Sequence, residues 1–211
     1  MAFRRHIVRR RIFLAMVFIA IPLIHIPGAY AATPAEAFVS DNIQKGLRTL
    51  NDSQLSVAQR SEQFERLLLT ITDMNRVAVF TLGQYAQAAS PADRAAFAAA
   101  FQNYSVAVYR SYLGKYAGQT LKITGSSERS SSDFIVTTNM IDPNDHSGQR
   151  PLEVDFRIRT DTGRPEITDL GIAGVWLAIE ERDQFGAFLA QNHGDINMLV
   201  AHLHDVANSY R

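Results

Sequence analysis

The stretch LEVDFRIR, residues 152–159, alternates strictly between apolar and charged side chains. A period of two is typical of a β-strand that has one buried and one solvated face. The apolar face would carry four side chains: Leu152, Val154, Phe156 and Ile158. The stretch therefore predicts a sheet with one face turned toward a core.

Further strands flank this one. Residues 120–124 and 134–140 also alternate, and residues 166–179 predict a fourth strand that bends at its glycines. The serine-rich residues 125–132 are expected to form a loop. Short polar turns between the alternating stretches indicate an antiparallel meander.

Helical patterns lie on both sides of the strands. Thr33 and Ser90 are each followed by proline and then by an acidic residue in the first turn, which is typical of a helix start. Residues 33–117 are expected to be mostly helical, and two more helices are expected at 182–192 and from 195 to about 208. The order predicts an α+β fold: a twisted antiparallel four-stranded sheet wrapped by N- and C-terminal helices.

The N-terminal segment has the pattern of an export signal. Residues 1–11 contain five arginines and no acid, and residues 12–26 are almost entirely apolar. Ala29 and Ala31 are the small residues that a signal peptidase reads, so cleavage is expected after Ala31. The apolar run is shorter than the roughly 20 residues of a membrane span. We therefore expect residues 1–31 to be a cleaved signal peptide and residues 32–211 to form a single exported domain.

Charge and cysteine content exclude several classes of function. Without residues 1–31 the chain has 16 basic and 21 acidic residues, a net charge of about −5. That balance argues against a nucleic-acid partner, which needs clustered lysine and arginine. The chain has no cysteine, which excludes disulfides, thiolate nucleophiles and thiolate metal sites.

The polar residues suggest neither a catalytic nor a metal site. His202 and His204 lie two apart on an expected helix, so their side chains point about 200° apart. Asp155 and Asp169 lie in strands, where each is interpreted as a solvated carboxylate and alternatively as a general base. The charge run at residues 180–183 is interpreted as a solvated helix start. No catalytic residues, metal or cofactor are expected.

The apolar residues are more informative. Aromatic and aliphatic side chains line the long helix that follows Ser90, and others line the sheet. Such stripes are typical of a core, but an apolar cleft between sheet and helices would also suit acyl chains. Burying a sixteen-carbon tail would contribute roughly 12 kcal/mol at about 0.8 kcal/mol per methylene.

Four stretches, taken in order, resemble the MlaC family of periplasmic lipid-binding components of Mla transport systems, also called the toluene-tolerance auxiliary family. The first is RVAVFTLGQY, residues 76–85, and the third is ITDLGIAGV, residues 167–175. The second is carried by Phe97, Phe101, Tyr109, Leu113 and Tyr116. The fourth is carried by Arg182, Phe185, Leu189, Gly194 and Leu199.

The resemblance implies a soluble periplasmic carrier of phospholipid, with acyl chains between sheet and helices and no catalytic residues. It also implies two partners: an inner-membrane complex of an ABC transporter with an MCE-domain protein, and an outer-membrane lipoprotein complex. Face and spacing suggest ten lipid-binding wall residues: Phe101, Tyr104, Val108, Tyr109, Val154, Phe156, Ile158, Leu170, Ile172 and Val175.

Two other functions remain open from the residues alone. One is a small-molecule enzyme on a similar curved sheet, with Asp169 or Asp155 as its base. The other is a periplasmic interaction module that has a filled core and no ligand.

Overall fold

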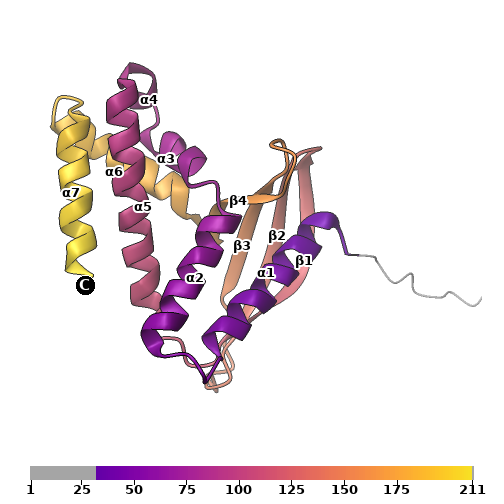
Figure 1. Cartoon of the computed structure of the whole chain (residues 1–211). Helices are drawn as coiled ribbons and strands as arrows, with labels where there is room; N and C mark the ends of the chain where they lie inside the picture. The colour runs from indigo at the N-terminus through magenta and orange to yellow at the C-terminus, as the bar shows by residue number, and fades with distance from the viewer. Residues whose placement is uncertain (1–31, 211) are drawn as a thin grey trace, which may run out of the picture. The chain divides into compact units, whose positions relative to one another are not determined.

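The predicted order of helices, sheet and helices is confirmed in a computed structural model, which describes residues 32–210 (Figure 1). The first helices are α1 (Pro34–Leu50), α2 (Val57–Ile71), α3 (Met74–Leu82), α4 (Tyr85–Ala88) and α5 (Pro91–Leu113). The strands are β1 (Thr120–Ser130), β2 (Asp133–Ile141), β3 (Glu153–Arg159), β4 (Glu166–Ile172) and β5 (Val175–Trp176). Helices α6 (Leu177–Gln191) and α7 (Ile196–Ser209) follow.

Two of the expectations concern segments that could meet a membrane. The predicted signal segment, residues 1–31, lies outside the described residues. Within residues 32–210, the structure contains no helix with the length and apolar character needed to cross a bilayer.

The expected helix starts are built as their sequences indicate. The hydroxyl of Thr33 accepts a hydrogen bond from the Glu36 amide, and the Glu36 carboxylate accepts one from the Thr33 amide at 2.9 Å. Ser90 caps α5 by accepting from the Asp93 amide at 3.1 Å. Each such cap stabilises its helix by about 1 kcal/mol.

The five strands form one antiparallel sheet in chain order. Phe156 pairs with Val136 on β2 and with Leu170 on β4, so the three side chains share one face. Helices α1 and α2 cross the sheet on one side (Figure 1), and Val39 of α1 packs into the same buried cluster as Val136. The alternation in residues 152–159 is therefore confirmed as the pattern that separates the buried from the polar face.

The sheet differs from the prediction in having five strands rather than four. The stretch at residues 166–179 is interrupted by Ala173 and Gly174, with φ angles of 50° and 83°. Two successive positive φ angles are typical of a two-residue hairpin turn, which returns the chain as β5. Helix α6 then begins at Leu177, earlier than the expected residue 182.

The serine-rich stretch was predicted to be a loop, and that prediction is wrong. Ser126 and Ser127 belong to β1 and pair with Val136 and Ile135 of β2. The apolar β2 supplies a complete ladder of backbone partners, and these outweigh the weak strand propensity of serine. Register shifts at Ile123/Gly125 and Glu128/Ser130 accommodate the irregular sequence.

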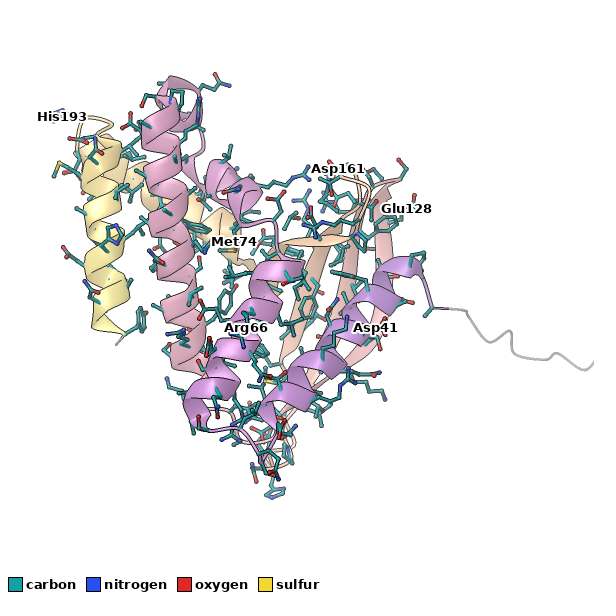
Figure 2. The ribbon with its side chains drawn as sticks, in the orientation of Figure 1. Asp41, Arg66, Met74, Glu128, Asp161 and His193 are labelled. Atoms are coloured by element: carbon teal, nitrogen blue, oxygen red, sulfur yellow. The ribbon has the colours of Figure 1, made fainter. Side chains whose placement is uncertain are left out.

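The opposite face of the sheet holds a network of ion pairs. Arg157 on β3 donates from Nε and Nη2 to the two carboxylate oxygens of Asp133 on β2, at 3.1 and 2.7 Å. Arg76 on α3 makes a similar pair with Asp161, at 2.8 and 2.7 Å. Figure 2 shows Asp161 in the hairpin that joins β3 to β4. The network ties neighbouring strands together and attaches α3 to the sheet.

Replacing Asp133 with asparagine is expected to lower the free energy of unfolding at neutral pH by about 1–3 kcal/mol, because the half-buried Arg157 loses its charged acceptor. The Arg157 hydrogen bonds hold the pKa of Asp133 below its usual value of 3.8. A lowered pKa in the folded state stabilises the protein above about pH 4, and this contribution disappears as the pH falls through the lowered pKa.

Urea unfolding at pH 7 and at about pH 3 measures the free energy of unfolding and its pH dependence. The difference in this free energy between wild type and the Asp133→Asn variant should be smaller at the lower pH. Glu62→Gln is the control, because Glu62 forms an exposed ion pair with Arg66 and its loss should change stability by about 0.5 kcal/mol or less. Equal decreases in the free energy of unfolding in Asp133→Asn and Glu62→Gln would contradict the structural role of the ion-pair network.

Candidate functional site

The apolar residues gather in two separate clusters. The helical cluster contains eleven buried residues from α3, α5, α6, α7 and the α4–α5 turn: Ala78, Leu82, Ala89, Phe97, Ala100, Phe101, Phe185, Leu189, Ile196, Leu199 and Leu203. The sheet cluster contains Ala35, Val39, Ile71, Val136, Ile158 and Ile167. The two clusters share no residue, so the apolar interior is divided.

Aromatic rings define the centre of the helical cluster. The Phe185 ring of α6 stands edge-on to the Phe97 and Phe101 rings of α5, with centroids 5.9 and 6.3 Å apart. Tyr104 lies one turn further along α5, with its ring centroid 6.4 Å from that of Phe185. Edge-to-face pairs contribute about 0.5–1.5 kcal/mol each beyond their burial.

The ten predicted wall residues are distributed over both clusters. Phe101 and Tyr104 belong to or border the helical cluster. Phe156, Ile158 and Leu170 belong to or border the sheet cluster. The ten residues therefore come from both clusters rather than from one.

The remaining wall residues lie between or beyond the clusters. Val154 is buried and pairs with Ile172, which puts both on the sheet face that carries Phe156. Ile172 and Val175 leave 37% and 50% of their surfaces exposed, although both are large and apolar. Val108 and Tyr109 of α5 are half-buried.

Polar contacts join the two clusters along a seam. Three links define it: Arg110 of α5 pairs with Glu65 of α2, the Asp73 amide donates to the Ile167 carbonyl, and the Ala178 amide of α6 donates to Asp169 of β4. Each link connects an element of the helical cluster with α2 or β4. The seam is thus held by hydrogen bonds and ion pairs rather than by a continuous apolar core.

Asp169 is a structural acceptor at this seam. Its Oδ1 accepts hydrogen bonds from the Leu170 and Ala178 amides, both at 2.8 Å. Burial raises the pKa of Asp169, and these two hydrogen bonds oppose the rise. The prediction that Asp169 is a solvated strand carboxylate is therefore wrong, because 7% of the residue's surface is exposed.

Tyr109 lies close to the charges of the seam. Burial raises the pKa of Tyr109 to about 12, and the neighbouring carboxylates of Asp169 and Glu181 add to the rise. Glu181 in turn accepts a hydrogen bond from the Tyr104 hydroxyl at 2.7 Å. The Tyr109 phenol of α5 is thus influenced by one carboxylate from β4 and by another from α6.

The sequence reasoning missed Glu181. The charge run at residues 180–183 was expected to be a solvated helix start, whereas Glu181 is half-buried and Arg182 lies over the Phe80 ring, 4.9 Å from its centroid. The spacing Ala178, Glu181, Phe185 matches one helical face, so a correct start for α6 would have placed Glu181 on the buried side.

Gly171 and Trp176 form a second feature that the sequence reasoning missed. A Cβ on Gly171 would lie 3.2 Å from the Asp155 Cβ and 3.4 Å from the Trp176 ring. The absent side chain therefore lets the tryptophan ring close over β4 beside Asp155. Asp155 Oδ1 is buried and makes no hydrogen bond within residues 32–210.

The histidines at positions 202 and 193 lie apart from the seam. His202 stacks on Phe188 with the ring centroids 4.8 Å apart. Figure 2 shows His193 in the turn between α6 and α7, away from the sheet. In the part of the chain that the structure describes, no three histidine or acidic side chains are grouped as metal ligands.

Two small hollows occur on the surface. One has a volume of about 220 Å³ and is lined by residues around Tyr85 and Asp195, and the other has about 230 Å³ and is lined by residues around Asp73 and Arg164. Neither contains any of the ten predicted wall residues.

These features define a class of α+β proteins in which helices pack on one face and at one edge of an antiparallel sheet. A family model described as MlaC protein matches residues 40–205, and the chain belongs to this family. The fold is also similar to that of a phospholipid-binding protein from Ralstonia solanacearum, solved in complex with a phospholipid. That match has a TM-score of 0.72 and 18% sequence identity, and it covers 84% of this chain and 99% of the other.

Replacing Asp169 with alanine is expected to lower the free energy of unfolding by about 1–3 kcal/mol, because the buried Ala178 and Leu170 amides lose their charged acceptor. Denaturant titration measures the change. Asp183→Ala is the matched control on α6, since its side chain is 68% exposed and its loss should cost less than about 0.5 kcal/mol. An unchanged Asp169→Ala variant would show that the carboxylate has no structural role.

Proposed function

We propose that this chain binds a diacyl phospholipid, with the acyl chains inserted between the helical cluster and the sheet cluster. The observation that carries the proposal is the division of the apolar interior into two clusters joined by a polar seam. Acyl chains placed at the seam would contact apolar side chains on both sides. Family membership and the phospholipid-bound structure of the Ralstonia solanacearum protein support the same conclusion.

The exposed end of the sheet suggests where the lipid enters. Leu152, Ile172 and Val175 are 42%, 37% and 50% exposed. Leu152 lies two residues before the buried Val154, Val154 pairs with Ile172, and Ile172 pairs with Val175. All three exposed residues therefore continue the sheet face of Val154. An apolar strip that runs from solvent to the buried Val154 would let an acyl chain enter along apolar side chains.

The energy of burial is sufficient for a carrier. A sixteen-carbon chain transferred from water gains roughly 12 kcal/mol at about 0.8 kcal/mol per methylene. Part of this gain is offset by the separation of side chains now in contact and by the ordering of the lipid. The remainder would still hold the lipid out of water.

The wider role follows from the family and the predicted export signal. We infer that the chain works in the periplasm after cleavage behind Ala31. It would exchange phospholipid between an inner-membrane complex of an ABC transporter with an MCE-domain protein and an outer-membrane lipoprotein complex. Transfer of labelled phospholipid between vesicles that carry the two complexes, with and without this chain, tests the exchange. Equal transfer of the labelled phospholipid in the absence of this chain would rule out the proposed exchange.

A binding protein fits the site better than an enzyme. Asp169, the strongest candidate for a general base, already accepts two backbone hydrogen bonds. Asp155 has an unpartnered oxygen but lies beneath Trp176. Turnover of a substrate lost in Asp155→Asn, with lipid content unchanged, would favour the enzyme.

Val154→Asp or Phe156→Asp is expected to abolish lipid binding, because a charge in the apolar wall opposes contact with acyl chains. Mass spectrometry of an organic extract from purified residues 32–211, produced in a periplasm, should find one diacyl lipid per wild-type molecule and little in the variants. Circular dichroism establishes that each variant is folded.

Ile141→Asp is the matched control. Ile141 is exposed on β2 and alternates to the sheet face opposite that of Met140 and its partner Leu121, so this variant should keep its lipid. Wild-type protein without lipid, even after incubation with phospholipid vesicles, would rule out the proposed function and favour the ligand-free interaction module.

A further inference from the structure

Glu181 has one buried oxygen without a partner. Its Oε1 accepts a hydrogen bond from the Tyr104 hydroxyl at 2.7 Å. Its Oε2 is buried and makes no hydrogen bond to any of the described residues. A buried carboxylate oxygen left unpaired costs free energy, and such groups in native proteins usually meet a bound water or a ligand. The orphaned oxygen therefore marks a place where a hydrogen-bond donor is missing.

Two tyrosines of α5, Tyr104 and Tyr109, lie near this carboxylate. Tyr104 donates to it, and the pKa of Tyr109 responds to its charge. Tyr112, in the last turn of α5, and Tyr210, at the end of α7, are close enough to Tyr104 to affect its pKa. Figure 1 shows α7 ending beside the lower part of α5. Tyr112 and Tyr210 are 65% and 47% exposed, so solvent reaches one side of this group.

Glu181 adjoins the seam at which acyl chains are proposed to bind. It lies three residues after Ala178 on α6, one helical turn from the amide that donates to the seam residue Asp169. A phospholipid with its tails in the seam could thus bring its headgroup to Glu181.

The chemistry of the group suits a cation that carries N–H donors. A carboxylate accepts strong hydrogen bonds from an ammonium group, and phenol rings attract cations through their faces. The neighbouring Arg182 is engaged elsewhere, because it lies over the Phe80 ring and pairs with Asp183. A trimethylated ammonium has no N–H and could not satisfy the orphaned oxygen.

We propose that Glu181 is a specificity-determining residue that accepts a hydrogen bond from the primary ammonium of a zwitterionic phospholipid headgroup. The inference rests on the proposed function, because it names the headgroup of the lipid bound at the same site. Tyr104 acts as a positioning residue, since its hydroxyl holds Oε1 and orients the carboxylate.

Competition between two lipids tests the proposal. Wild-type protein is incubated with vesicles that contain equal amounts of phosphatidylethanolamine and phosphatidylcholine with identical acyl chains, and the extracted lipids are quantified by mass spectrometry. The two headgroups have the same charge, and they differ in the three methyl groups that replace the ammonium hydrogens of phosphatidylethanolamine. One charge-assisted hydrogen bond should favour phosphatidylethanolamine about tenfold. In Glu181→Gln, which keeps the shape and removes the charge, the ratio should fall toward one.

Two further variants complete the test. Glu180→Gln is the control, because it removes an exposed charge from the same helix and should keep the wild-type ratio. Tyr104→Phe removes the hydroxyl that orients the Glu181 carboxylate, so it should lower the preference for phosphatidylethanolamine, and it serves as the test if Glu181→Gln does not fold. An unchanged ratio in Tyr104→Phe would contradict the positioning role.

The outcomes separate this proposal from the proposed function. Loading of both lipids in equal amounts by wild-type protein would overturn the role of Glu181, with water then as the partner of Oε2, while lipid binding itself would stand. A Glu181→Gln variant that keeps the wild-type preference would also overturn the role of Glu181 and leave lipid binding intact. Failure of wild-type protein to load either lipid would overturn both proposals.

Discussion

The carboxylate of Asp169 joins the two halves of the apolar interior. Its Oδ1 accepts the Ala178 amide at the start of α6 and the Leu170 amide on its own strand. The amides of a first helical turn carry partial positive charge, so a carboxylate at this position stabilises the helix that follows. From there α6 carries Phe185 into the helical cluster, whereas β4 carries Ile167 into the sheet cluster. The orientation of the helices relative to the sheet thus depends on this contact.

The polar seam gives the molecule an interior unlike that of an ordinary core. Each cluster is closed by its own contacts: aromatic rings among the helices, and aliphatic side chains between the sheet and α1 and α2. Ion pairs and hydrogen bonds hold the clusters together. The Arg110–Glu65 pair is partly exposed and can exchange with water at little cost, whereas the hydrogen bond from Ala178 to Asp169 is buried. An apolar ligand placed at the seam would extend both clusters without dismantling either. The division of the core is the physical basis of the proposed carrier.

Much of the fold could be predicted because its signals are local. Caps at Thr33 and Ser90 define helix starts through neighbouring amides, and the period of two in residues 152–159 follows from the strand itself. The extension of β1 through Ser126 could not be predicted, since it depends on backbone pairing with β2 across a hairpin. The start of α6 has no side-chain cap of its own and takes its acceptor from Asp169, eight residues earlier than Leu177.

The candidate site was predicted less completely for a related reason. Face and spacing identify residues that point inward, and Val154, Ile158 and Phe101 are indeed buried. Face and spacing do not show that these side chains belong to two separate clusters, because that division depends on how the helices pack against the sheet. The sequence did not indicate a role for Glu181, because this residue follows another glutamate in the charge run at residues 180–183. Its partner Tyr104 lies 77 residues away in the chain.

Photocrosslinking with a phospholipid that carries a diazirine in one acyl chain tests most directly whether lipid tails occupy the seam. After loading and illumination, peptide mapping identifies the labelled residues. Binding at the seam predicts labels on sheet residues such as Phe156 and Leu170 together with labels on Val108 or Tyr109 of α5. Labels confined to exposed residues such as Val57 or Met198, with none on the sheet or on these α5 residues, would contradict it.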